Sequence, residues 1–156
     1  QRFGGHAMAA GLAIREEDFQ AFVAAFDKVL SVELGEDVLL HKKYIDGALE
    51  KDCFSLDFAS VLREAGPWGQ HFPEPEFQGQ FEVINSRVVG EKHLKLTLQV
   101  PDSDQLIDAI AFNTEQVLLE NKLATITVVY RLDVNEFRGV SNAQLMVDAI
   151  VDYALA

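Results

Sequence analysis

Alternating apolar and polar residues mark the second half of this chain. The clearest run covers residues 93–100, His-Leu-Lys-Leu-Thr-Leu-Gln-Val, in which every second residue is apolar. Successive side chains of a strand point to opposite faces, so this run predicts a strand with one buried and one solvent-facing side. Related runs predict five strands in all, at residues 78–89, 93–100, 106–112, 124–134 and 144–151. Turns are expected at 90–92 and 101–104, and a loop at 135–139.

Helical spacing of apolar residues occurs at three places. Residues 16–34 carry five of them on one side of a predicted helix, with acidic residues in the first turn and Gly35 as its stop. A second helix is expected at 55–65 and a short third one at 114–122, with Thr114 as N-cap. The apolar side of the first helix has little of its own to pack against, and it consists of Phe19, Phe22, Val23, Phe26 and Leu30. In the second helix Phe58, Val61 and Leu62 are expected to point inward, and in the third Val117, Leu118 and Leu119 are expected to be partly buried.

The segments between these elements are shorter and less regular. A short strand is expected at residues 12–14 and an extended stretch from Val38 to Tyr44. Residues 66–77 hold three prolines and two glycines, which exclude regular structure and fix the chain direction. We interpret this run as a rigid connector with Trp68 and Phe72 held against the core.

The order of the predicted elements indicates a fold class. Five strands with a helix between the third and the fourth is the order of an OB-fold, a small, partly open Greek-key barrel. The expected class is therefore mainly β with flanking helices. A β-sandwich or another small barrel remains an alternative at this point.

Composition and charge narrow the function classes. The chain has 156 residues, 49% of them hydrophobic, which suffices for a core in one to one and a half domains. No apolar run approaches the roughly 18–20 residues that span a bilayer, there is no signal-peptide pattern, and Cys53 is the single cysteine. We expect a cytoplasmic protein without a membrane partner. The net charge of −12 argues against nucleic acid, although the distribution of the charges matters more than their sum.

Candidate binding residues follow from the predicted barrel. OB-folds bind oligonucleotides across strands 2 and 3 and in the loops that join strands 1–2 and 4–5. Cations suit phosphates, and aromatic rings suit unstacked bases. The alternative is a plain solvent-facing surface, with Phe137 folded back onto the barrel. The candidates are His93, Lys95, Thr97 and Gln99 on strand 2, Lys92 in the first loop, Asn135, Phe137 and Arg138 in the second, and Arg87 and Arg131 near strand ends close to these loops.

No catalytic or metal-binding pattern accompanies them. The four histidines, His6, His41, His71 and His93, are far apart in sequence and lack metal-ligand spacing. Cys53 has no local partner that would activate its thiol. We therefore expect neither a metal nor a cofactor in this chain, and no catalysis by the chain alone.

The first residues differ in character from the rest. Residues 3–11 read Phe-Gly-Gly-His-Ala-Met-Ala-Ala-Gly. Glycines allow close backbone approach to a ligand or a positive φ, and a histidine can donate a hydrogen bond to a phosphate. We expect a ligand-contacting turn here, in a chain that is a piece of a larger protein cut just upstream.

Taken in order, several motifs resemble the RecJ family of single-strand-specific exonucleases in the DHH phosphoesterase superfamily. The resemblance spans nearly the whole chain, and its strength lies in the number and order of individually weak motifs. The connector departs from it, with His71-Phe72 in place of glycine-asparagine. The matching segments are Phe3 to His6 with Ala9 to Gly11, Gly66 to Gly69 with Pro73 to Phe77, His93 to Leu96, Asp108 to Asn113, Leu132 to Gly139, and Gln144 to Val147.

The resemblance implies three parts and a larger enzyme. Residues 1–35 would be the C-terminal remnant of a DHHA1 domain, 36–76 a connector with a helix, and 77–152 the OB barrel. Gly4, Gly5 and His6 would grip the substrate beside the scissile phosphate. The parent would degrade single-stranded DNA from the 5′ end in recombination and repair, with Mn or Mg held by an absent DHH domain. The implied partners are single-stranded DNA and the single-strand-binding protein.

Two other functions remain open from the sequence. The barrel could be a protein-interaction module without nucleic-acid binding, as the acidic total permits. The chain could also come from another DHHA1 protein, such as an oligoribonuclease or a cyclic-dinucleotide phosphodiesterase. Residues 66–151 argue against the latter, because those proteins generally end near the glycine-histidine motif.

Overall fold

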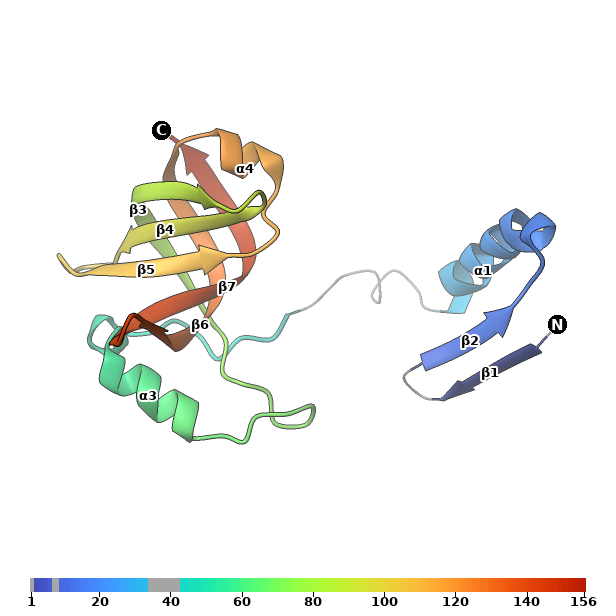
Figure 1. Cartoon of the computed structure of the whole chain (residues 1–156), viewed down its shortest axis with the longest axis horizontal. Helices are drawn as coiled ribbons and strands as arrows, with labels where there is room; N and C mark the ends of the chain where they lie inside the picture. Colours follow the sequence, from blue (N-terminus) through green and yellow to red (C-terminus); the bar gives the residue numbers. More distant parts are fainter. Residues whose placement is uncertain (1, 7–8, 34–42) are drawn as a thin grey trace. The chain divides into compact units, whose positions relative to one another are not determined.

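The computed structural model describes residues 2–6, 9–33 and 43–156. It divides the chain into two compact units, residues 1–43 and 44–156 (Figure 1). The expected helix stop at Gly35 and residues 38–42 of the expected extended stretch lie outside the described residues. The three-part division at residues 35 and 76 stays a prediction.

The first unit begins with an antiparallel hairpin of β1 (Arg2–His6) and β2 (Ala9–Ala13). The sequence predicted only one short strand at 12–14. Two of the five residues of β1 are glycine, and four of the five residues of β2 are glycine or alanine, so neither strand shows the apolar alternation that marks a strand. Gly4 lies opposite Gly11 in the register.

A helix follows the hairpin. The acidic residues expected in its first turn form the 3-10 turn η1 (Glu16–Asp18), and α1 runs over Phe19–Glu33. Arg15 pairs with Glu17 at 2.9 Å and with Asp18 at 3.1 Å. The predicted apolar side of α1 is largely exposed: Phe19 and Phe26 are both 51% exposed.

The second unit contains a closed five-stranded barrel. Its strand order is β3-β4-β5-β7-β6, with β5 and β7 parallel and the other neighbours antiparallel. This order confirms the OB-fold and excludes a β-sandwich. The strands are β3 (Phe77–Val89), β4 (His93–Gln99), β5 (Leu106–Ala111), β6 (Leu123–Phe137) and β7 (Val140–Leu155).

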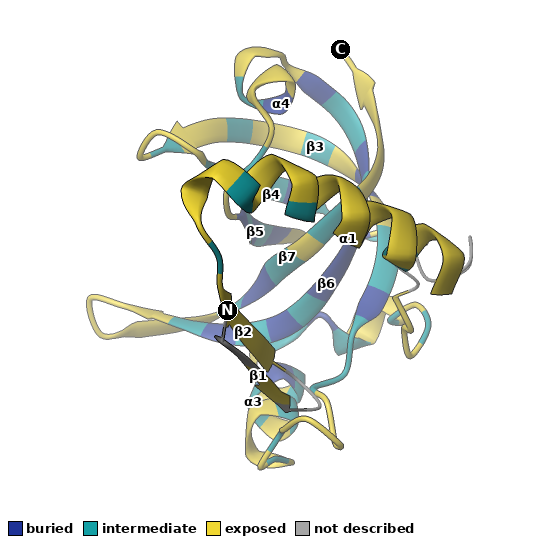
Figure 2. Ribbon diagram, turned by 90° about the vertical axis from the view of Figure 1, so that its right-hand side faces the viewer, coloured by how far each residue is buried: buried dark blue, intermediate teal, exposed yellow. Residues whose placement is uncertain are grey.

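The barrel core follows the predicted alternation. Leu94, Leu96 and Leu98 of β4 are at most 2% exposed, whereas their neighbours on the strand are half-buried. Buried segments run along the barrel strands in Figure 2. At one end the core becomes an aromatic cluster, formed by Phe54, Phe77, Phe81 and Tyr130.

Gly79 of β3 leaves room for this cluster. A Cβ atom at this position would lie 2.9 Å from two ring atoms of Phe81 and 3.5 Å from the Tyr130 ring. The missing side chain therefore lets the Phe81 ring pack against the strand backbone.

Short helices accompany the barrel. η2 (Lys51–Cys53) leads to α3 (Leu56–Glu64), whose N-cap Ser55 accepts a hydrogen bond from the Phe58 amide at 3.2 Å. The expectation that Val61 points inward was wrong, because it is 60% exposed.

The helix between the third and fourth barrel strands, α4 (Gln116–Glu120), is shorter than predicted. Its N-cap is Glu115, so the prediction of Thr114 was wrong. The Thr114 hydroxyl instead donates to the Ala111 carbonyl, which ties it to the end of β5. No described helix is long and apolar enough to cross a bilayer.

The connector before β3 is irregular, as predicted. The Trp68 indole donates to the Leu62 carbonyl at 3.2 Å, and its ring centroid lies 4.9 Å from that of Phe72. Trp68 is thus half-buried beside the end of α3. Phe72 is 59% exposed, so the prediction that both aromatic residues are held against the core was wrong for Phe72.

The predicted loop at 135–139 was wrong. β6 continues to Phe137, and β7 begins at Val140. The turn between them therefore has only two residues, Arg138 and Gly139. Their φ angles of 52° and 79° are both positive, as in the two-residue turns whose twist matches paired strands. The sequence signal was missed because such turns usually carry asparagine or aspartate before the glycine.

Candidate nucleic-acid interface

The outer faces of β4 and β5 carry the predicted polar residues. Lys95 Nζ lies 2.8 Å from Asp108 Oδ2, and the Thr97 hydroxyl donates to the other carboxylate oxygen at 3.3 Å. The Lys95 side chain is 25% exposed. Its charge is therefore already compensated on this face.

The end of this face near the β3–β4 turn combines cations with two rings. The His93 and Phe112 ring centroids lie 5.0 Å apart, edge to face. The backbone amide of Asn113 donates a hydrogen bond to His93 Nδ1 at 3.2 Å, which orients the imidazole ring. Lys92 in the turn and Arg87, opposite Lys95 in the register, are exposed and form no ion pair with any described residue. Both cations lie close to the first turn, where the sequence predicted them.

The tip of the β6–β7 hairpin forms a second cluster. The Arg138 guanidinium carbon lies 5.1 Å from the centroid of the Phe137 ring. Phe137 is 64% exposed, so it does not fold back onto the barrel. No ion pair to Arg138 occurs within the described ranges.

A groove connects β4 with this hairpin. Its volume is about 470 Å³, and it is bordered by the start of α3 at Ser55 and Leu56. Because residues of β4, β5, β6 and β7 line the same groove, the outward sides of these strands meet on one concave surface. The polar lining is Thr97, Asp108, Asn135, Asn142 and Gln144, together with Gln105 and Ser141.

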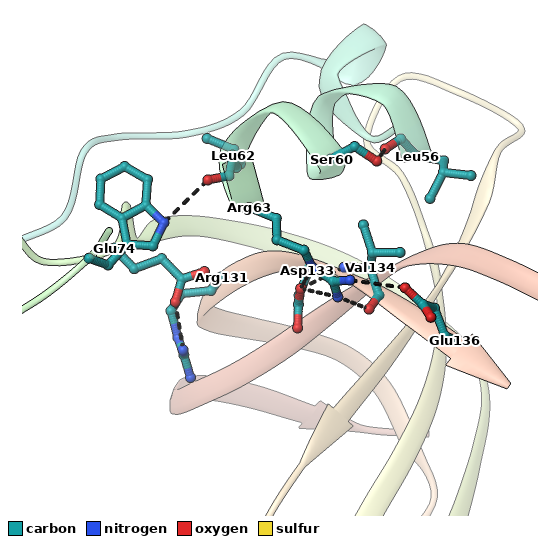
Figure 3. A network of polar contacts seen from close by, with 10 residues as sticks. Leu56, Ser60, Leu62, Arg63, Glu74, Arg131, Asp133, Val134 and Glu136 are labelled. Atoms are coloured by element: carbon teal, nitrogen blue, oxygen red, sulfur yellow. Dashed lines mark hydrogen bonds and ion pairs between the residues drawn. The ribbon is translucent and has the colours of Figure 1, made fainter. Parts of the chain in front are cut away.

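The predicted position of Arg131 near a strand end was wrong. It lies in the interior of β6, where its guanidinium donates to Asp148 at 2.8 and 3.0 Å. It also donates to Glu74 at 2.8 Å (Figure 3). The hydrogen bonds to Asp148 and then to Glu74 raise the pKa of Arg131 further above its usual value. The side chain thereby fastens the connector to β6 and β7.

Arg63 of α3 makes a second network of this kind. It donates to Asp133 at 2.8 and 3.2 Å, to Glu136 at 3.2 Å and to the Val134 carbonyl (Figure 3). The hydrogen bond to Asp133 is the main reason that the pKa of Arg63 is raised. The network holds α3 against the hairpin and compensates two carboxylates on β6.

The N-terminal glycines lie in a strand instead of a turn. Gly4 and Gly5 are exposed residues of β1, paired with Gly11 and Ala10. His6 is the last residue of β1, and its side chain lies outside the described residues. The predicted substrate-binding role of these three residues stays a prediction.

The charge balance of the barrel unit is acidic. Residues 44–156 hold 8 Lys and Arg against 18 Asp and Glu. Of these cations, Arg63, Lys95 and Arg131 are engaged in the ion pairs described above. Within the described part of the chain no group of three or more His, Cys, Asp or Glu residues could hold a metal ion.

Three residues of this surface were missed from the sequence. Phe112 and Asn142 lie at or beyond the expected strand ends, and Gln144 was treated only as the start of the last strand. Gln144 directly precedes the buried Leu145, so alternation places its side chain on the outer face of the strand. Gln144 is nevertheless only 8% exposed. No local pattern indicates that long-range packing buries it.

Comparisons with known proteins agree with this geometry. Residues 45–149 match the RecJ OB domain. The single-stranded-DNA-specific exonuclease RecJ of Escherichia coli K12 is 41% identical over 150 residues, which cover 96% of this chain and 26% of that protein. The RecJ of Bacillus subtilis 168 is 26% identical over 155 residues, covering 96% of this chain and 19% of the relative.

A solved structure shows the same fold. The RecJ of Thermus thermophilus in complex with Mn²⁺ superposes with a TM-score of 0.65 at 21% identity, over 97% of this chain and 22% of the other. The chain thus spans about a quarter of the length of the relatives that it matches.

Proposed function

The chain belongs to the RecJ family through its OB domain, and from this premise we propose that its barrel binds single-stranded DNA as part of a 5′–3′ exonuclease. The parent enzyme would act in DNA recombination and repair in the bacterial cytoplasm. Relatives over the same range bear the name of a single-stranded-DNA-specific exonuclease.

One observation carries the proposal: cations without ion pairs among the described residues occur together with aromatic rings at two places, the tip of the β6–β7 hairpin and the β3–β4 turn. Arg138 and Phe137 lie at the hairpin tip, and Lys92, His93 and Phe112 lie at the β3–β4 turn. Single-stranded DNA needs this pairing, because phosphates attract cations while unstacked bases stack on flat rings. Arg87 and Asn135 belong to the proposed surface, whereas Lys95 and Arg131 already have carboxylate partners.

Hydrolysis belongs to other parts of the parent. Two solved structures of the T. thermophilus RecJ are described, one in complex with Mn²⁺ and one in complex with Mg²⁺. The described residues of this chain contain no group of three or more His, Cys, Asp or Glu that could hold such an ion. We propose that the metal is held by a DHH domain and that Gly4, Gly5 and His6 contact substrate from a DHHA1 segment at 1–35. The 156-residue chain should release no nucleotide from DNA with added Mn²⁺, and release by the pure chain would refute this part.

Fluorescence anisotropy with a labelled dT12 oligonucleotide at low salt tests DNA binding. We expect weak binding by the chain and a loss of affinity of about three- to tenfold in Arg138→Gln, because a phosphate contact and the support of the Phe137 ring are removed. Lys122→Gln is the matched control. This variant also removes one positive charge. Lys122 is exposed, lies outside the groove and forms no ion pair with any described residue. Equal affinities of the two variants would contradict the proposed site.

The acidic surplus of the barrel unit favours one alternative, an interaction module that binds protein instead of DNA. The single-strand-binding protein is the partner that the family resemblance suggests. A pull-down with purified single-strand-binding protein, together with an absence of any oligonucleotide signal, would support this alternative.

A further inference from the structure

We infer that the groove between β4 and the β6–β7 hairpin takes an unstacked nucleobase and hydrogen-bonds its edge through Gln144. This inference rests on the proposed binding of single-stranded DNA and assigns a role within that surface. Its starting point is Gln144, a largely buried residue of the groove whose amide has no hydrogen-bond partner among the described residues.

Gln144 is unusual among the polar residues of the barrel. Its side chain is only 8% exposed and lines the groove, yet its amide forms no hydrogen bond with any described residue. The amide atoms are open to the solvent of the groove and are not sealed in the core. A ligand group that both donates and accepts would satisfy this amide.

Two more amides face the same space. Asn135 and Asn142 are directly paired residues of β6 and β7, and both side chains line the groove without a hydrogen-bond partner among the described residues. The residues that lie opposite Gln144 in the register, Asp108 of β5 and Asp133 of β6, are already engaged. Asp108 is held by Lys95 and Thr97, and Asp133 is held by Arg63. The groove therefore offers free amides beside compensated carboxylates.

This chemistry fits a base better than a phosphate. A phosphate needs a cation, and the described lining holds no lysine or arginine. Bases carry adjacent donors and acceptors, which asparagine and glutamine pair with two at a time, and their edges are free in single strands. Phe137 lies two residues from Asn135 on the same face of β6, so an exposed ring and Arg138 stand next to the groove.

The test combines protein variants with base removal. The 156-residue chain is titrated with labelled dT12 and with an oligomer of equal length and charge whose residues are abasic. We expect the wild type to bind dT12 about five- to tenfold more tightly. Gln144→Met, which is nearly isosteric, and Asn142→Ala, at an exposed position, should each lower the affinity for dT12 about fivefold and leave that for the abasic oligomer unchanged.

Controls separate this inference from the proposed function. Gln80→Ala removes an exposed amide of β3 outside the groove and should change neither affinity; circular dichroism melting checks that each variant is folded. If the Gln144→Met and Asn142→Ala variants lose equal affinity for both oligomers, or lose affinity for neither, the base contact is overturned while DNA binding stands. Unchanged affinity for both oligomers is also the result expected if the groove holds a peptide. An absence of binding to both oligomers by the wild type would overturn the proposed function and this inference together.

Discussion

At the residue scale, the tip of the β6–β7 hairpin combines an exposed aromatic ring with an unusual backbone conformation. Arg138 adopts a positive φ of 52° although a side chain disfavours this conformation by about 1–2 kcal/mol. Glycine or asparagine would fit the turn better. Backbone strain of this kind concentrates at functional sites. Here it places a guanidinium over an exposed ring at the hairpin tip.

Tyr130 shows the opposite situation, a titratable group fully inside the core. Burial raises the pKa of its phenol above the ordinary value of about 10. The folded state thus favours the neutral phenol, whereas the unfolded chain ionises near pH 10. The resulting stabilisation is complete below pH 10 and is lost as the pH rises from there toward the folded-state pKa.

Tyr130→Phe should therefore flatten the fall of unfolding free energy with alkaline pH. Urea unfolding of the wild type and the variant at pH 8, 10 and 11 measures this slope. Tyr153→Phe, at an exposed position of β7, is the matched control and should retain the wild-type slope. Parallel pH profiles of Tyr130→Phe and the wild type would show that the phenol does not contribute.

At the scale of elements, ion pairs fasten the irregular segments to the barrel. Arg131 connects the segment before β3, through Glu74, with Asp148 of β7. These side chains are only 22–35% exposed, so the pairs are less screened than the far more exposed pairs of Arg15.

Arg131→Met should lower the free energy of unfolding by about 1–2 kcal/mol, because two carboxylates lose their shared donor. Chemical denaturation gives this difference. Arg87→Met is the control and should cost less than about 0.5 kcal/mol, since Arg87 is exposed and forms no ion pair in the described residues. A stable Arg131→Met variant with weakened DNA binding would instead assign Arg131 to the DNA surface.

The elements also show how far the sequence predicts the structure. The alternation of β4 and the order of strands and helix determine the barrel, because both depend on short-range patterns. The prediction of a loop at the hairpin tip was wrong. Residues 135–137 lack the alternation of a strand, yet all three are paired with β7. The pairing of Arg131 with Glu74 and the burial of Gln144 depend on residues far apart in sequence, which local patterns do not reveal.

At the scale of the whole molecule, charge limits how the chain can bind DNA. The barrel unit carries 18 acidic residues against 8 basic ones. On the proposed surface, the cations without an ion pair to any described residue are Arg87, Lys92 and Arg138. Binding should therefore be weak and should depend more on stacking and on hydrogen bonds to bases than on phosphate neutralisation. This balance distinguishes the account from a general basic DNA-binding surface.

The salt dependence of dT12 affinity tests this claim most directly. Three phosphate contacts on a single strand predict a slope of log affinity against log salt of about −2. The double variant Lys92→Gln with Arg138→Gln should have a slope of about −0.7, from the one contact that remains. A slope that the double variant does not change, or no binding at the lowest salt, would contradict the account.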